Sequence, residues 1–97
     1  MISKQERNNY NFESLFGSKA RIKILKILCV NRELSISQII KKARLNHSCV
    51  LKHLNYLNSA DLIQEKRFGR IKIYRYKIEN FKAKSLKIFI EIWEGKH

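Results

Sequence analysis

Apolar residues recur at helical spacing through most of the chain. Between positions 19 and 31 they follow the i, i+3, i+6, i+7 pattern of one helix face, which carries Ile22, Leu25, Leu28 and Cys29. Ser18 precedes this segment and is its expected N-cap. Ile24 and Ile27 add a second apolar side. A helix that is apolar on two sides has two contacts, so we expect one side to face the core and the other a partner subunit.

The following segment predicts a short extended piece and then two helices joined by a tight turn. The extended piece covers residues 33–36, and Ser37 is the expected N-cap of a short amphipathic helix that ends near Arg44. Asn46 lies in the turn and caps a third helix that runs to about Ser59. The expected buried stripe of this helix comprises Val50, Leu51, Leu54 and Leu57. Its opposite face is polar.

Two helices that meet at a tight turn form the helix-turn-helix pattern. The polar face of the second helix fits a DNA major groove, because Asn pairs with adenine, Lys reaches guanine or phosphate, and Ser and Tyr donate to phosphate. The residues predicted to contact DNA from this helix are His47, Ser48, Cys49, Lys52, Asn55 and Tyr56. Any surface helix has a polar face, so the position directly after the turn carries the interpretation.

Alternation of apolar and basic residues then predicts a β-hairpin. Its strands are expected within residues 62–67 and 71–78, on either side of a turn that contains Gly69. Asp61 takes the left-handed position that ends the preceding helix. A basic hairpin beside a helix-turn-helix is typical of a DNA-binding wing, with predicted contacts from Arg67, Arg70 and Lys72. The alternative is an ordinary edge hairpin whose Lys and Arg residues oppose aggregation.

Residues 79–94 predict a last helix that is apolar on two sides. One stripe comprises Leu86, Phe89, Ile90 and Trp93, and the other comprises Phe81, Ile88 and Ile92. A domain of this size can bury only one side of its terminal helix. We therefore expect the other apolar side to pair with a second copy of the chain about a two-fold axis. The alternative is that this side stays partly exposed. The residues expected at the dimer interface are Ile24, Ile27, Phe81, Leu86, Phe89, Ile90 and Trp93.

These elements predict a mostly α fold with a small β-hairpin, that is, a winged helix-turn-helix with a C-terminal dimerisation helix. Residues 1–11 are polar and aperiodic, which indicates a flexible arm. Residues 12–78 form the predicted winged domain, which opens with one helical turn at residues 13–16. Residues 79–97 form the C-terminal helix.

Charge points to a polyanionic partner. The chain has 97 residues with 21 Lys and Arg against 8 Asp and Glu, a formal net charge of +13. A nucleic acid offsets the self-repulsion of such a chain through counterion release, and an anionic membrane surface is the alternative. The polar N-terminus has no signal-peptide pattern, and the longest apolar run, Ile27 to Val30, is too short to cross a bilayer. We therefore expect a cytoplasmic, nucleoid-associated protein.

The titratable residues predict neither catalysis nor a cofactor. No phosphate loop, no Cys/His pair and no paired carboxylates are visible, so the chain is not expected to be an enzyme. The histidines His47, His53 and His97 have no thiolate or carboxylate at ligand spacing, so no metal site is expected. Cys29 is expected to pack in the core. Cys49 is interpreted either as a small residue close to DNA or as a redox switch.

Three stretches resemble the ArsR-like family of winged-helix regulators. They are LFGSKARIKILKIL at residues 15–28, LNHSCVLKHLNYLNSADLI at 45–63 and RFGRIKIYRY at 67–76, with Arg21 in the place of the family's usual arginine. The resemblance implies the winged fold and a regulatory role. One departure concerns the Glu-Leu-Cys-Val-Cys motif of metal-sensing members, where residues 33–37 read ELSIS. Serine hydroxyls replace both thiolates, so thiophilic metal sensing is not expected.

The function predicted from these features is sequence-specific binding of double-stranded DNA by a homodimeric transcription regulator. One alternative is a chromatin-like architectural protein with little sequence preference, and another is a winged-helix adaptor between proteins. No pocket for a small-molecule effector is evident from the sequence. The Ile- and Lys-rich composition without proline suggests an A/T-rich archaeal or viral genome.

Overall fold

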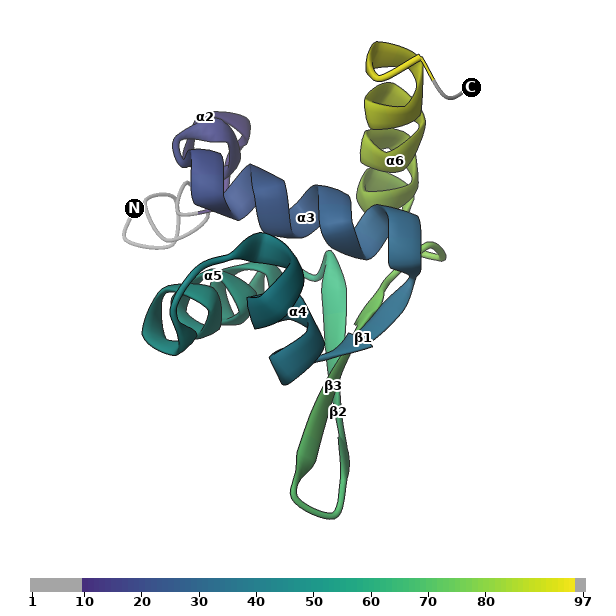
Figure 1. The fold of residues 1–97 in the computed structure, drawn as a ribbon. Helices are drawn as coiled ribbons and strands as arrows, with labels where there is room; N and C mark the ends of the chain where they lie inside the picture. The colour runs from purple at the N-terminus through teal and green to yellow at the C-terminus, as the bar shows by residue number, and fades with distance from the viewer. Residues whose placement is uncertain (1–9, 96–97) are drawn as a thin grey trace, which may run out of the picture.

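The computed structural model describes residues 10–95, which form five α-helices and three β-strands. In chain order the elements are α2 (Phe12–Phe16), α3 (Lys19–Asn31), β1 (Glu33–Ser35), α4 (Ile36–Ala43), α5 (His47–Ser59), β2 (Ile63–Phe68), β3 (Ile71–Tyr76) and α6 (Phe81–Trp93). Figure 1 shows α3 crossing the middle of the molecule, with α6 projecting on one side of it and the β2–β3 hairpin extending away on the other. The predicted winged helix-turn-helix fold with a C-terminal helix is confirmed.

The helix-turn-helix consists of α4 and α5. The predicted caps at Ser18 and Asn46 are confirmed, because their side chains accept hydrogen bonds from the amides of Arg21 and Cys49. The helices that these two residues cap, α3 and α5, have the predicted bounds. Asp61 has a φ of 66°, as expected for the residue that ends α5. The amide of Leu62 donates to the carbonyl of Leu57 at 3.1 Å, which completes a Schellman-type end.

Two predicted helix starts are wrong. The N-cap of α4 is Ser35 rather than Ser37, because Ser35 and Gln38 form a reciprocal capping box. The last helix begins at Phe81 rather than at residue 79, because Asn80 caps it by accepting from the amide of Ala83. In both cases the side chain that satisfies the free amides of the first turn determines where the helix begins.

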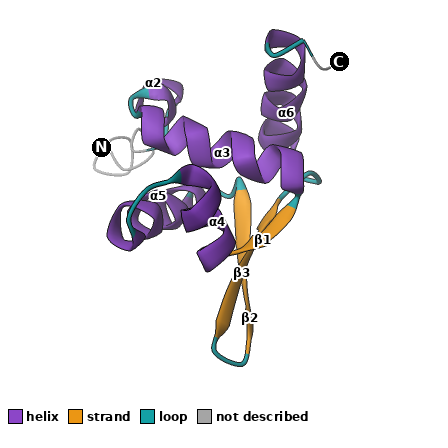
Figure 2. Ribbon diagram, viewed as in Figure 1, coloured by secondary structure: helices purple, strands orange, loops and turns teal. Residues whose placement is uncertain are grey.

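The three strands form one antiparallel sheet in the order β1-β3-β2 (Figure 2). The hairpin register pairs Ile63 with Tyr76 and Phe68 with Ile71. Gly69 turns the hairpin with a φ of 63°, a conformation that glycine adopts without strain. The short β1 strand adds a third member, since Leu34 pairs with Tyr74. The predicted hairpin is therefore part of a small sheet.

The core lies where α3, α4 and α5 pack against the sheet. Its fully buried large side chains are Ile24, Leu25, Leu28, Ile39, Val50, Leu54, Leu57, Ile63 and Tyr74. Ala83 is the buried residue through which α6 joins this core, and most of α6 lies outside it. The core is thus built by the helix-turn-helix and its preceding helix, and α6 is attached at one end (Figure 1).

The expected flexible arm at residues 1–11 lies mostly outside the described residues. Its last two residues are structured, so the predicted boundary is wrong there. Asn11 caps α2 by accepting from the amide of Ser14 at 2.8 Å. The ring of Tyr10 packs against the ring of Tyr56, with centroids 5.1 Å apart.

Candidate DNA-binding surface

The exposed face of α5 carries most of the residues predicted to contact DNA. His47, Ser48, Lys52 and Asn55 are exposed, and Cys49 is half-buried. Ser48 donates to the Asn46 side chain at 3.0 Å. No hydrogen bond or ion pair within residues 10–95 engages the side chains of Lys52 or Asn55. Their polar atoms are available to a ligand.

Tyr56 has a different place from the predicted one. The guanidinium of Arg21 lies over its ring, with Cζ 3.6 Å from the ring centroid. Its hydroxyl is hydrogen-bonded to the hydroxyl of Ser14. The hydroxyl thus has a partner within the chain, and its contact with phosphate stays a prediction. Tyr56 connects α5 to α2 and α3 through a cation–π contact and a hydrogen bond.

His53 and Arg21 complete this cluster beneath α5. His53 is buried, with 4 % of its surface exposed, rather than at the helix flank as expected. Arg21 donates from Nε to His53 Nδ1 at 3.3 Å and from a terminal nitrogen to the carbonyl of Ser14 at 2.7 Å. Nδ1 therefore carries no proton. Burial lowers the pKa of His53 from 6.5, and the cations Arg21 and Lys52 lower it further.

The sequence contained part of the signal for this cluster. His53 follows Val50 by three residues and precedes Leu57 by four, so it lies on the buried stripe of α5. Its partner is thirty-two positions away on another helix, and no local pattern indicates that contact.

The tip of the hairpin is exposed and basic. Arg67 and Arg70 are exposed, and Lys72 is half-buried. Arg67 lies 3.7 Å from a carboxylate oxygen of Glu65, whereas Arg70 has no ion pair within the described residues. Phe68 and Ile71 flank the turn with more than half of their surface exposed. The hairpin presents apolar and cationic groups together.

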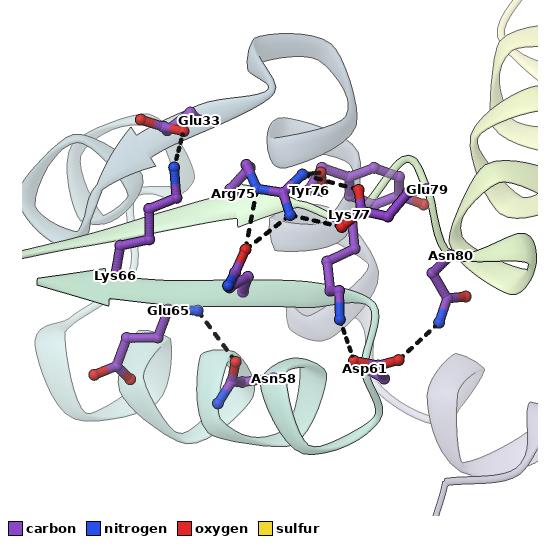
Figure 3. Close-up of polar contacts among 11 residues, drawn as sticks. Glu33, Asn58, Asp61, Glu65, Lys66, Arg75, Tyr76, Lys77, Glu79 and Asn80 are labelled. Atoms are coloured by element: carbon purple, nitrogen blue, oxygen red, sulfur yellow. Dashed lines mark hydrogen bonds and ion pairs between the residues drawn. The ribbon is translucent and has the colours of Figure 1, made fainter.

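Polar contacts fix the root of the hairpin to the helices (Figure 3). Asn58 of α5 accepts from the backbone amide of Glu65 in β2 at 3.2 Å. Asp61 accepts from Lys77 at 2.5 Å and from Asn80 at 2.9 Å, which links the end of α5 to the end of β3 and the start of α6. These hydrogen bonds lower the pKa of Asp61 below its usual range. The exposed face of α5 and the hairpin thus have a fixed relative position.

Arg75 makes a second set of contacts at the same root. It donates to both carboxylate oxygens of Glu79, at 2.9 and 2.7 Å, and to the side chain of Gln64 (Figure 3). These hydrogen bonds lower the pKa of Glu79 to about 2. The bidentate geometry joins β3 to the segment that leads into α6.

Ion pairing leaves a surplus of free cations. Six of the seven acidic residues within residues 10–95 are paired, and the pairs are Glu94–Lys26, Glu33–Lys66, Glu65–Arg67, Glu79–Arg75, Asp61–Lys77 and Glu91–Lys87. Most basic side chains within residues 10–95 therefore have no acidic partner there, and these include Lys52 on α5 and Arg70 and Lys72 on the hairpin. This arrangement attracts a polyanion.

Large apolar side chains are exposed along α6. Phe81 and Trp93 are 86 % and 77 % exposed, and Ile88, Phe89 and Ile92 are exposed as well. Leu86 and Ile90 are half-buried against the chain's own core. Ile24 is fully buried in that core, so its predicted place in a dimer interface is wrong. The core therefore takes in Ile24 from the second apolar side of α3, whereas Ile27 from the same side is half-buried.

The thiols do not form a metal or disulfide site in the described part of the chain. Both cysteines are free, and Cys29 is buried as predicted. Burial raises the pKa of the Cys29 thiol to about 11, which leaves it protonated at neutral pH. Between residues 10 and 95 no three His, Cys, Asp or Glu side chains come together as metal ligands. No helix in this range is long and apolar enough to cross a membrane.

Comparison with known proteins agrees with this architecture. Residues 18–65 match the family model described as "Bacterial regulatory protein, arsR family". Among curated protein sequences no match is found. Similar solved structures include the transcriptional regulator HlyU from Vibrio vulnificus CMCP6, with 20 % identity, a TM-score of 0.73, and 96 % of this chain and 93 % of that chain covered.

Two further structures are similar over nearly the whole chain. The transcriptional repressor PagR of Bacillus anthracis is 21 % identical, with a TM-score of 0.70 and with 92 % of this chain and 97 % of that chain covered. The homodimeric winged helix-turn-helix domain Mb0332 from Mycobacterium bovis is 18 % identical, with a TM-score of 0.72 and with 99 % of this chain and 85 % of that chain covered. At such identities these similarities establish the fold alone.

The fold and the free polar face of α5 define a winged helix-turn-helix protein. Within that class, residues 18–65 are similar to the bacterial regulatory proteins of the arsR family. Serine stands at both cysteine positions of the metal-sensing motif, and Ser35 serves as the N-cap of α4.

Proposed function

We propose that this protein is a sequence-specific regulator that binds double-stranded DNA. The observation that carries the proposal is the row of exposed polar side chains on α5, where Lys52 and Asn55 have no hydrogen bond or ion pair among residues 10–95. Arg70 at the tip of the hairpin is also unpaired within these residues. In this arrangement α5 lies in the major groove and reads base edges, while the hairpin holds the flanking backbone or minor groove. His47, Ser48 and Cys49 lie at the N-terminal end of α5. In the proposed arrangement this end of the helix would be nearest to the bases.

The proposed active form is a homodimer that pairs through α6. Five large apolar side chains are exposed on this one helix, which a monomer leaves in water at a cost. The similar Mb0332 domain is homodimeric. A two-fold dimer implies a palindromic site with half-sites about 34–36 Å apart, or a multiple of that distance. The interface we propose contains Phe81, Phe89 and Trp93, with Leu86 and Ile90 at its edge.

Selection of bound sites from a random DNA pool tests the reading role of α5. Wild-type protein is expected to recover a palindromic consensus. Asn55→Ala removes the side chain that pairs with adenine and is expected to relax the consensus at one position of each half-site. Asn31→Ala, at the exposed end of α3, is the matched control and should return the wild-type consensus. An identical consensus for Asn55→Ala and wild type removes Asn55 from the base contacts.

The net charge of +13 also favours a second function, a low-specificity architectural protein that coats DNA. The ratio of specific to non-specific affinity separates the two, since a regulator shows roughly a thousandfold or more. A third candidate, an adaptor between proteins, predicts that DNA binding is lost at modest salt. The regulator and the architectural protein would both lie with DNA in the cytoplasm.

A further inference from the structure

A groove separate from the α5 face lies between α2, α3 and α4. Its volume is about 450 Å³. Its apolar floor consists of Phe16, Ile22 and Ile27, with Phe16 exposed and the two isoleucines half-buried. No residue of α5 or of the hairpin lines it. The groove is therefore a surface that the proposed DNA contacts leave unused.

Lysines surround this apolar floor. Lys19, Lys23 and Lys26 lie at successive turns of α3, and Lys42 approaches from α4. Lys26 is paired with Glu94 at 3.1 Å, whereas the other three have no ion pair or hydrogen bond within the described residues. None of the seven acidic residues between positions 10 and 95 lines the groove. The site thus combines an uncovered apolar strip with three unneutralised cations.

We propose that this groove docks an acidic amphipathic segment of another protein. Apolar side chains of that segment would cover Phe16, Ile22 and Ile27, and its carboxylates would pair with Lys19, Lys23 and Lys42. Burial of the floor supplies affinity, and the lysines select an acidic sequence and speed association. Laying an amphipathic helix into such a groove is a common mode of peptide recognition.

A second copy of this chain is a poor occupant. Six of its seven described acidic residues already pair within the chain, so a copy brings few free carboxylates to the three lysines. Juxtaposing two chains of net charge +13 at a lysine-lined groove adds repulsion. The exposed face of α6 offers a copy apolar contact instead. Ile27, which the sequence assigned to a dimer, therefore belongs to the groove.

DNA is also a poor occupant of this groove. A phosphate backbone satisfies lysines but does not cover an apolar floor, because its contacts are charged and hydrated. An acidic amphipathic helix satisfies both parts of the site. Because the groove and the α5 face share no residue, the protein is able to bind DNA and this partner together.

The test uses the full chain and a synthetic peptide about four helical turns long, with leucines on one face and glutamates on the other. Fluorescence anisotropy measures its affinity, and amide chemical shifts of labelled protein locate its site. The expected shifts cluster on α2, α3 and α4. The double variant Lys23→Glu/Lys42→Glu is expected to weaken binding by at least about tenfold. The control Lys82→Glu/Lys84→Glu has the same net charge and should change affinity less than about twofold.

Four outcomes overturn the proposal. Equal binding of a scrambled peptide of the same composition, or equal loss in both double variants, shows attraction to net charge alone. Shifts of the groove amides on addition of duplex DNA assign the groove to the DNA interface. Conversion of a wild-type dimer to monomer by Lys23→Glu/Lys42→Glu assigns it to a second copy.

The inference is separable from the proposed DNA function. DNA affinity and circular dichroism of Lys23→Glu/Lys42→Glu should remain close to those of the Lys82→Glu/Lys84→Glu control. If the wild-type protein bound no DNA while the peptide results held, the DNA proposal would fail and the docking groove would stand.

Discussion

His53 shows how one residue joins three helices. It lies on α5, accepts a hydrogen bond from Arg21 on α3, and through Arg21 is linked to the carbonyl of Ser14 on α2. The stacking of Arg21 on Tyr56 adds a second link between the same helices. The spacing of α5 places His53 on the buried stripe, whereas its pairing with Arg21 depends on tertiary structure. The sequence therefore predicted the helix, but it placed His53 at the helix flank and did not indicate the contacts of Tyr56 with Arg21 and Ser14.

The buried His53 predicts a loss of stability in mild acid. Its pKa is lowered in the folded chain, whereas in the unfolded chain it titrates near 6.5. The unfolded state therefore binds more protons below that pH, and the free energy of unfolding falls as the pH drops from about 6.5 through the folded pKa. His53→Gln keeps an acceptor for Arg21 and removes the titration. Urea unfolding at pH 7, 6 and 5 should show a shallower pH slope for this variant; equal slopes contradict the assignment.

Caps determine the element boundaries, and the sequence predicted them unevenly. Ser18, Asn46 and Asp61 were recognisable because each stands directly beside a clear apolar period. The start of α4 was misplaced because Ser35 and Ser37 are both capping residues, and only the reciprocal contact with Gln38 distinguishes them. The β1 strand pairs with β3 about forty positions away, which no local pattern encodes.

The N-cap of α5 is expected to make a measurable contribution to the free energy of unfolding. Asn46 accepts from the amide of Cys49 at 2.8 Å, so Asn46→Ala leaves a first-turn amide without this partner. The expected loss is about 1 kcal/mol in the free energy of unfolding. Asn46→Ser retains a capping oxygen and should recover most of that loss. Urea denaturation provides the measurement, and equal stability of the two variants contradicts a capping role.

The hairpin is expected to add a phosphate contact without sequence preference. Arg70 is exposed at its tip and has no ion pair among the described residues. Arg70→Ala should weaken binding to specific and random duplexes alike and reduce the slope of log affinity against log salt by about one. Lys84→Ala on α6 serves as the control. An unchanged slope in a titration series for Arg70→Ala indicates an edge hairpin instead of a DNA-binding wing.

At the scale of the whole molecule, the class of fold followed from the sequence, and the assembly surfaces followed only in part. The order of helices, turn and hairpin was sufficient for the winged fold, since each element has a local pattern. The two apolar sides of α3 and α6 were visible too. Which side faces the core depends on packing, and Ile24 proved to be interior while Ile88 and Ile92 are exposed.

Assembly through α6 predicts an oligomeric state that depends on its exposed aromatic residues. Phe89 and Trp93 pack ring against ring with centroids 6.0 Å apart on the uncovered face. Phe89→Asp/Trp93→Asp should convert a dimer to monomers, because it places charges in an apolar contact. Sedimentation velocity over a concentration series measures the change. Lys82→Asp/Lys84→Asp introduces the same residue on α6 and should leave the dimer intact; a persistent dimer in the first variant assigns the interface elsewhere.

The side chains of Lys52 and Asn55 do not contribute to the polar contacts that hold the fold together, and this has an evolutionary consequence. Neither side chain takes part in a hydrogen bond or ion pair within the described residues, while Val50, Leu54 and Leu57 on the same helix hold it in place. Substitutions at the outer positions therefore leave the scaffold undisturbed. Under the proposed function, single codon changes at these two positions would alter the preferred operator while the architecture of the protein stays the same.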